Sequence, residues 1–106
     1  MTEVNFYTAK NGDLLGFHIS GHSGYAEEGE DIVCAAISSA VYMVINTVTD
    51  IMHIDAEVSV DDGDAVFRIL SKHAVACRDI LQGLKLHLLS LEEQYCDFII
   101  VKYTEV

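Results

Sequence analysis

The sequence predicts an α+β fold in which two helices pack on a mainly antiparallel sheet, with the elements in the order ββαββαβ. Three observations predict it: two pairs of β-prone segments joined by hairpin-type turns, a long apolar stretch, and a segment with apolar residues at helical spacing. The 106 residues suffice for one domain, spanning 1–106. Hydrophobic residues make up 51% of the chain, which indicates an ordered core.

Five strands are expected. Residues 4–9 and 14–20 form the first hairpin, because the Asn11-Gly12 pair between them suits a tight turn. Alternating apolar and polar residues predict a half-buried strand over 56–61. The following Asp62-Gly63 turn returns the chain as a strand over 65–70, and a last strand is expected over 97–103.

Two helices separate these strands. Asp31 is a good N-cap for a helix from Ile32 to about Met52, and its apolar residues cover most of the circumference. We therefore expect this helix to be largely buried against the sheet, with another subunit as an additional way to cover it. Ser71 is the expected cap of a second helix running to about Leu91. Its apolar face consists of Ala74, Cys77, Leu81, Leu84, Leu88 and Leu91. Gly83 within this helix suggests a close backbone approach.

The charge of the chain restricts its partners. A formal net charge of −11 argues against direct binding of nucleic acid, which needs clustered Lys and Arg. The same charge fits a basic peptide as partner, but it would also serve solubility alone. We expect a cytoplasmic protein with no membrane span, because residues 1–5 do not resemble a signal peptide and the apolar run 32–45 is short.

Cysteine and histidine provide the candidate chemistry. Cys34 lies in the expected first turn of an apolar helix, where the helix dipole favours thiolate over thiol. His22 stands in a glycine-rich loop 12 positions earlier and is suited to accept the proton of the sulfur. A thiolate with an imidazolium is the working unit of cysteine peptidases and acyltransferases. Backbone N–H groups at the helix start, including that of Cys34, are expected to stabilise an oxyanion.

Other residues have more than one interpretation. Asp31 either caps the helix or orients the imidazole of His22. Ser38 lies one turn beyond Cys34, where it hydrogen-bonds either within the site or back to the helix backbone. The glycines and the acidic residues of the loop predict mobility and a solvated face, with recognition of a basic substrate as the minor alternative. These acidic residues are Glu27, Glu28 and Glu30.

The remaining cysteines and histidines give no second site. Cys77 and Cys96 are assigned to packing or to a neutral surface role. Three cysteines without CxxC spacing indicate reduced thiols, and no metal site or cofactor is expected.

The segment Gly21-His22-Ser23-Gly24-Tyr25-Ala26, then Gly29 and Asp31-Ile32-Val33-Cys34-Ala35-Ala36-Ile37-Ser38, resembles the signature of the ribosomal-processing cysteine protease family, Prp. The resemblance extends to chain length, acidity and the two-helix layout. One mild departure is Ser23, where alanine is common in the family.

The resemblance implies a cysteine endopeptidase that removes an N-terminal extension from a large-subunit ribosomal protein, the one numbered twenty-seven. It implies His22 and Cys34 as the catalytic dyad, and Gly21, Asp31 and Ser38 as supporting residues. It further implies a homodimer and a flexible substrate loop that contains Ser23, Gly24, Tyr25 and Gly29. The alternative from the residues themselves is a ribosome-assembly factor that binds a basic peptide without cutting it; a thiol-based redox sensor is a third reading.

Overall fold

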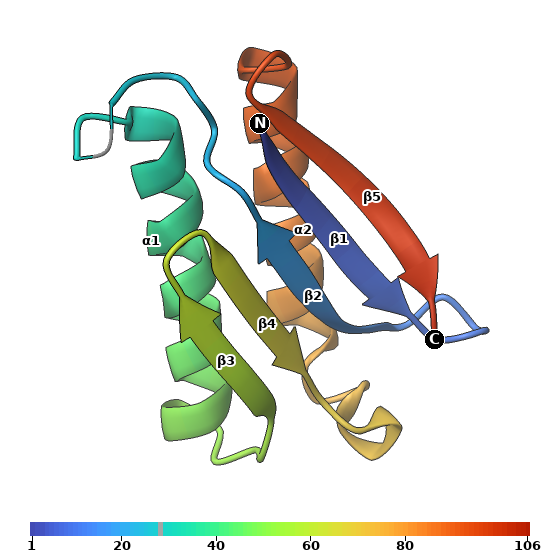
Figure 1. Ribbon diagram of the computed structural model, residues 1–106. Helices are drawn as coiled ribbons and strands as arrows, with labels where there is room; N and C mark the ends of the chain where they lie inside the picture. Colours follow the sequence, from blue (N-terminus) through green and yellow to red (C-terminus); the bar gives the residue numbers. More distant parts are fainter. Residues whose placement is uncertain (28) are drawn as a thin grey trace.

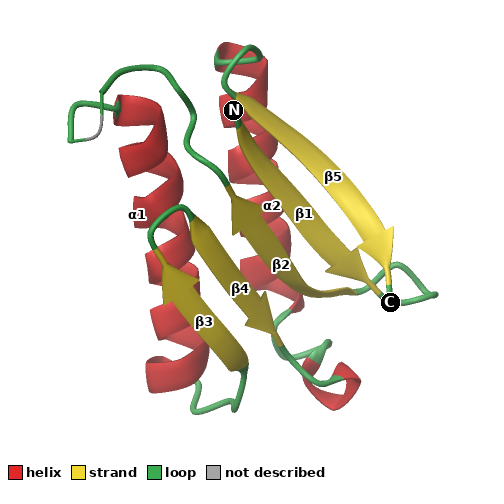
Figure 2. Ribbon diagram, in the orientation of Figure 1, coloured by secondary structure: helices red, strands yellow, loops and turns green. Residues whose placement is uncertain are grey.

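A computed structural model describes residues 1–27 and 29–106, so the expectation for Glu28 lies outside the described residues. Two long helices cover one face of a five-stranded sheet, whose strands run in the order β3-β4-β2-β1-β5 (Figures 1 and 2). The strands are β1 (Thr2–Thr8), β2 (Leu14–Ser20), β3 (Glu57–Asp61), β4 (Asp64–Arg68) and β5 (Ile99–Glu105). The long helices are α1 (Ile32–Asn46) and α2 (Arg78–Gln94). The order ββαββαβ is confirmed.

The sheet is mainly antiparallel, as the two hairpins predict. β1 pairs with β2, β2 with β4, and β4 with β3, all antiparallel. The exception is β5, which pairs with β1 in parallel and so joins the two ends of the chain in one ladder. This parallel pair is possible because α2 carries the chain back across the sheet before β5 begins.

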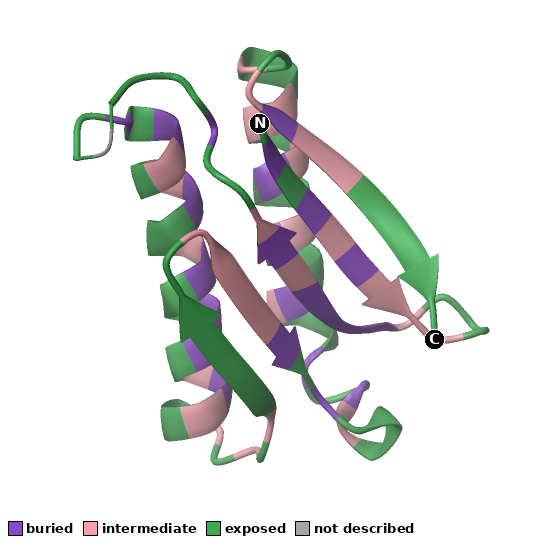
Figure 3. Cartoon of the chain, in the orientation of Figure 1, coloured by how far each residue is buried: buried purple, intermediate pink, exposed green. Residues whose placement is uncertain are grey.

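The core lies between the sheet and the helices. Phe6, Phe17 and Phe67 stand on neighbouring strands and are fully buried, with the rings of Phe17 and Phe67 stacked 5.2 Å apart. Figure 3 shows the same pattern along the chain, with β2 mostly buried and β3 exposed along its length. The central strands therefore form a rigid support, while β3 remains an open edge.

The first helix differs from its prediction in two ways. It ends as an α-helix at Asn46 and continues as a π-helical turn over Thr47–Ile51. It also buries only one face, because Tyr42 and Met43 are 48% and 57% exposed, so the expectation of a largely buried helix is wrong for the single chain.

The same helix bears on the expectation about membranes. With its π-helical turn it forms a 20-residue stretch, Ile32–Ile51, which by length and composition alone would cross a membrane. The argument that the apolar run is too short therefore fails. What distinguishes this helix is that Val33, Ile37, Val41 and Val44 are buried in the core against the sheet.

The second helix begins later than predicted. Ser71–His73 form a separate 3-10 turn, and α2 starts at Arg78 with Cys77 at its N-cap position. Ser71 therefore does not cap α2, since a hydroxyl can cap only the helix turn that directly follows it. Cys77 is fully buried, as expected of a packing residue. A Cβ added at Gly83 would have no neighbour within 4 Å, so the predicted close approach is also wrong.

Candidate active site

A cleft of about 750 Å³ lies between the first half of α1, the loop 21–31 and the β3–β4 hairpin. It brings together most of the residues that the sequence predicted for the site. Those lining the cleft are Gly21, His22, Gly24, Gly29, Asp31, Cys34 and Ser38. Ser23 and Tyr25 belong to the loop but do not line the cleft: Ser23 is buried, and the ring of Tyr25 packs against Tyr95 and Phe98.

Cys34 stands in the first turn of α1, as predicted. Asp31 is the N-cap in extended conformation, and its Oδ1 accepts a hydrogen bond from the N–H of Cys34 at 2.9 Å. The capping role proposed for Asp31 is therefore present. The same bond occupies the N–H of Cys34, which for that reason cannot be the expected oxyanion donor without giving up the cap.

Ser23 connects the loop to the start of the helix. Its N–H donates to Sγ of Cys34 at 3.2 Å, and its hydroxyl donates to Oδ2 of Asp31 at 2.5 Å. The same hydroxyl oxygen accepts from the N–H of Tyr25 at 3.2 Å. Only 2% of Ser23 is exposed. The sequence placed Ser23 among flexible residues, whereas the structure makes it a buried contact of both Asp31 and Cys34.

These contacts set the charge state of Asp31. Burial alone would raise its pKa, but hydrogen bonds from the Ser23 hydroxyl and from the backbone N–H groups of Cys34 and Ala26 outweigh it and lower the pKa from 3.8 to about 2. Asp31 is therefore a carboxylate at neutral pH, and both of its oxygens are engaged.

Tyr25 fixes the loop at a second point. Its ring packs edge-on against Tyr95 and Phe98, with centroids 5.7 and 5.3 Å away, at the junction of α2 and β5. The first half of the loop is thus held by hydrogen bonds and by aromatic packing. The predicted flexibility of the loop as a whole stays a prediction.

His22 faces the β3–β4 hairpin. Its Nε2 lies 3.7 Å from Oδ1 of Asp62, and its ring lies over Gly63, where an added Cβ would approach Nε2 to 2.9 Å. The N–H of Gly21 donates to the carbonyl of Gly63 at 2.8 Å, which ties loop and hairpin together. Within residues 1–27 and 29–106, no hydrogen bond joins His22 to Cys34. The imidazole and the sulfur nevertheless line the same cleft.

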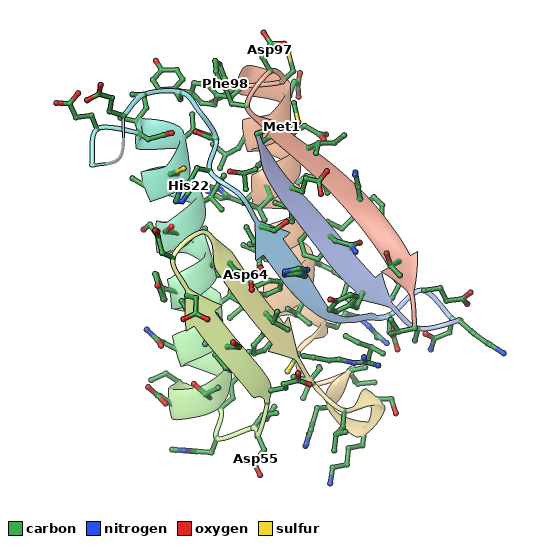
Figure 4. The ribbon with its side chains drawn as sticks, viewed as in Figure 1. Met1, His22, Asp55, Asp64, Asp97 and Phe98 are labelled. Carbon is green, nitrogen blue, oxygen red and sulfur yellow. The ribbon has the colours of Figure 1, made fainter. Side chains whose placement is uncertain are left out.

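Figure 4 shows His22 between the start of α1 and the β3–β4 turn, at the end of the molecule opposite to Asp55. The hairpin residues were missed as part of the site, because Asp62-Gly63 carries only a turn signal and stands 40 positions after His22 in the chain. Ser38 lines the cleft and is exposed; in the described part of the chain its hydroxyl makes no hydrogen bond, so neither interpretation of Ser38 is supported.

The cleft is acidic. Its carboxylates come from both walls, Asp31 on one side and Asp61, Asp62 and Asp64 on the other. Among the described residues that line it, none is Lys or Arg. Asp64 is already paired with His18, whose Nε2 lies 2.7 Å from Oδ1. The described residues contain no group of three or more His, Cys, Asp or Glu side chains placed to hold a metal ion.

Comparison with known proteins gives a consistent result. The family model described as cysteine protease Prp matches residues 1–100. A ribosomal processing cysteine protease Prp of Staphylococcus aureus is 27% identical over 105 residues, covering 97% of this chain and 99% of that protein. The protein of the same name from Bacillus subtilis is 31% identical over 48 residues, 45% of this chain and 43% of that one.

Solved structures agree. The crystal structure of the essential ribosomal processing protease Prp from S. aureus with a covalently linked product peptide aligns with a TM-score of 0.90 at 25% identity, covering 98% of this chain and all of that one. The same S. aureus protease with a substrate peptide aligns with a TM-score of 0.85 at 24% identity and the same coverage.

Proposed function

This chain belongs to the cysteine protease Prp family, and we propose that it removes the N-terminal extension of a large-subunit ribosomal protein, the one numbered twenty-seven. Membership makes the chain a cysteine protease. Cys34 is the proposed nucleophile and His22 the proposed proton acceptor. In this proposal Asp31 holds Cys34 in place, and Gly21 holds the neighbouring His22. The proposed compartment is the cytoplasm.

One observation carries the choice of Cys34. Its sulfur is the only cysteine sulfur that lines the cleft among the described residues, and it accepts a hydrogen bond from the backbone N–H of Ser23. The N–H of Ser23 and the N-terminus of α1 are both placed to stabilise the negative charge that the sulfur carries once its proton has been transferred to His22. Cys77 is buried in the core and Cys96 is exposed outside the cleft, so neither has this environment.

The proposed reaction follows from this arrangement. His22 takes the proton of the Cys34 thiol, and the sulfur then attacks the scissile carbonyl carbon. The protonated imidazole gives its proton to the leaving amine, which leaves an acyl-enzyme. His22 next activates a water molecule, and the hydrolysed acid departs. The N–H of Cys34 serves the cap, and the N–H of Ser23 bonds to the sulfur in the free protein. We propose the Ser23 N–H as the oxyanion donor, released from the sulfur when the negative charge of the sulfur passes into the new C–S bond.

The choice of a basic substrate segment rests on charge. Carboxylates of Asp31, Asp61, Asp62 and Asp64 surround a cleft whose described lining contains no Lys or Arg, and the whole chain carries a net charge of −11. A cationic peptide is attracted to such a surface, whereas nucleic acid is repelled. A ribosomal protein tail, which is typically basic, fits this requirement.

A homodimer completes the proposal. α1 exposes Tyr42, which also lines the cleft, and Met43, and the π-helical turn after α1 exposes Ile51 by 74%. β3 next to it is an open edge with Val58 and Val60 about 40% exposed. Exposed apolar side chains on these elements suit an interface, and a second copy of the chain is the partner that we propose to cover them.

The decisive experiment incubates the purified protein with a peptide spanning the extended N-terminus of the ribosomal protein and reads the products by mass spectrometry. One cut is expected, absent in Cys34→Ala and retained in the matched control Cys96→Ala. Turnover in Cys34→Ala would refute the mechanism. A peptide that is bound but left intact by the wild-type protein would favour a peptide-binding assembly factor instead.

A further inference from the structure

The imidazole of His22 needs a partner that Asp31 cannot supply. Oδ1 of Asp31 accepts from the N–H of Cys34, and Oδ2 accepts from the hydroxyl of Ser23. Asp31 is therefore committed to the helix cap and to the loop, on the sulfur side of the cleft. A residue that orients a catalytic imidazole must present a free carboxylate or carbonyl to one ring nitrogen.

Asp62 meets this requirement. Its Oδ1 lies 3.7 Å from Nε2 of His22, and among the described residues no other carboxylate oxygen lies within 4.0 Å of a ring nitrogen of His22. The distance is beyond a hydrogen bond of about 2.7–3.2 Å, but both side chains are more than half exposed and free to approach. Asp64, two positions on, is held by His18 and does not compete.

The backbone keeps the two residues together. The N–H of Gly21, next to His22, donates to the carbonyl of Gly63, next to Asp62, at 2.8 Å. Gly63 has a φ of +69° and no side chain, which allows the ring of His22 to lie directly over the turn. Loop and hairpin are thus joined at the residues that flank the pair.

We infer that Asp62 is a positioning residue for His22 and sets which ring nitrogen exchanges the proton with Cys34. Asp62 accepts the Nε2–H, and the neutral ring then presents the lone pair of Nδ1 to the thiol. The proton moves from Sγ to Nδ1, giving a thiolate and an imidazolium whose Nε2–H stays on Asp62. The inference rests on the proposed role of His22 with Cys34, and it adds a third member from the opposite wall of the cleft.

The test measures alkylation of Cys34 by iodoacetamide, which is neutral and requires no assumption about the substrate. All variants carry Cys96→Ser, so that the half-buried Cys34 is the only thiol outside the core. We expect His22→Ala to slow the reaction most and Asp62→Asn to slow it by about fivefold, the scale of one exposed ion pair. Asp62→Glu should recover part of the loss. Asp55→Asn removes the same charge at the far end of the molecule and should leave the rate unchanged (Figure 4).

The outcomes distinguish a failure of the Asp62 contact from a failure of the His22–Cys34 dyad. If His22→Ala slows alkylation and Asp62→Asn does not, Asp62 has no positioning role while the dyad stands. If His22→Ala has no effect either, the dyad itself is refuted. A loss in Asp61→Asn equal to that in Asp62→Asn would assign the effect to the field of the hairpin and overturn the specific contact.

Discussion

The backbone N–H of Ser23 donates a hydrogen bond to the sulfur of Cys34 across 3.2 Å, although the two residues are separated by a loop of ten positions. The contact exists because the Ser23 hydroxyl is bonded to Asp31, which in turn caps the helix that carries Cys34. Three residues thus form a closed ring of hydrogen bonds around the proposed nucleophile. The position of the loop is set by the same carboxylate that starts the helix.

Ser23→Ala should weaken this ring. The variant keeps the N–H but removes the hydroxyl that bonds to a buried carboxylate, and a hydrogen bond to a charged group contributes about 1.5–3 kcal/mol. We expect a lower free energy of unfolding, measured by urea titration, and slower peptide cleavage. Ser59→Ala on the exposed strand β3 is the matched control. Unchanged stability in Ser23→Ala would show that this ring of hydrogen bonds does not contribute to the free energy of unfolding.

The low pKa of Asp31 makes part of the stability depend on pH. Its pKa is about 2 in the folded protein and 3.8 ordinarily, so the contribution is fully present above about pH 4 and is lost as the pH falls through 2. The shift corresponds to about 2 kcal/mol. Urea titrations at pH 6 and pH 2.5 should show that Asp31→Asn, which retains a capping side chain, loses less stability than wild type. Equal losses of stability in both proteins would contradict a lowered pKa of Asp31 in the folded protein.

Gly63→Ala tests the contact with His22. A methyl group there would meet Nε2 of His22 at 2.9 Å and displace the ring. Gly12→Ala is a close control, because Gly12 also has positive φ, +92°, but has open space around its Cβ position. Both variants should lose about 1 kcal/mol of stability from backbone strain. Only Gly63→Ala should also slow cleavage and Cys34 alkylation, and equal rates in the two variants would refute the contact.

Met43→Glu addresses the proposed dimer. Met43 is 57% exposed on the outer face of α1, away from the cleft, so the single chain has no reason to unfold when a charge is placed there. In a dimer that uses this face as its interface, the carboxylate would be buried without a partner. Sedimentation velocity should show a dimer for wild type and a monomer for the variant. The control is Leu86→Glu at another exposed apolar position, on α2, where the side chain is 68% exposed.

Much of the fold could be predicted from local signals. The Asn11-Gly12 and Asp62-Gly63 turns placed two hairpins, and the Asp31 cap placed the start of α1, because each depends on residues adjacent in the chain. The start of α2 was placed too early. Apolar spacing continues through residues 71–77, but the backbone there forms a 3-10 turn over Ser71–His73 and a further turn over residues 74–77. Periodicity reports which side chains face the core and does not distinguish a helix from successive turns.

The part of the site formed by residues close together in the chain was predictable, and the part formed by distant segments was not. Cys34 with its cap lies within one helix turn, and the structure shows that arrangement. The approach of Asp62 to His22 and the packing of Tyr25 on Phe98 depend on strand order, which the sequence does not encode locally. The role of Ser23 had no signal beyond its small size, because its partners follow from the path of the loop.

The parallel ladder between β1 and β5 has a consequence for the timing of folding. Residues 2–8 can complete their pairing only when residues 99–105 are present. The loop that carries His22 is held through Tyr25, which packs on Tyr95 and Phe98. Pairing between such distant segments is slow to form and comes late in folding. During synthesis, the aromatic anchor of the loop therefore stays incomplete until Tyr95 and Phe98 have been added, although every described residue that lines the cleft lies at positions 2–65.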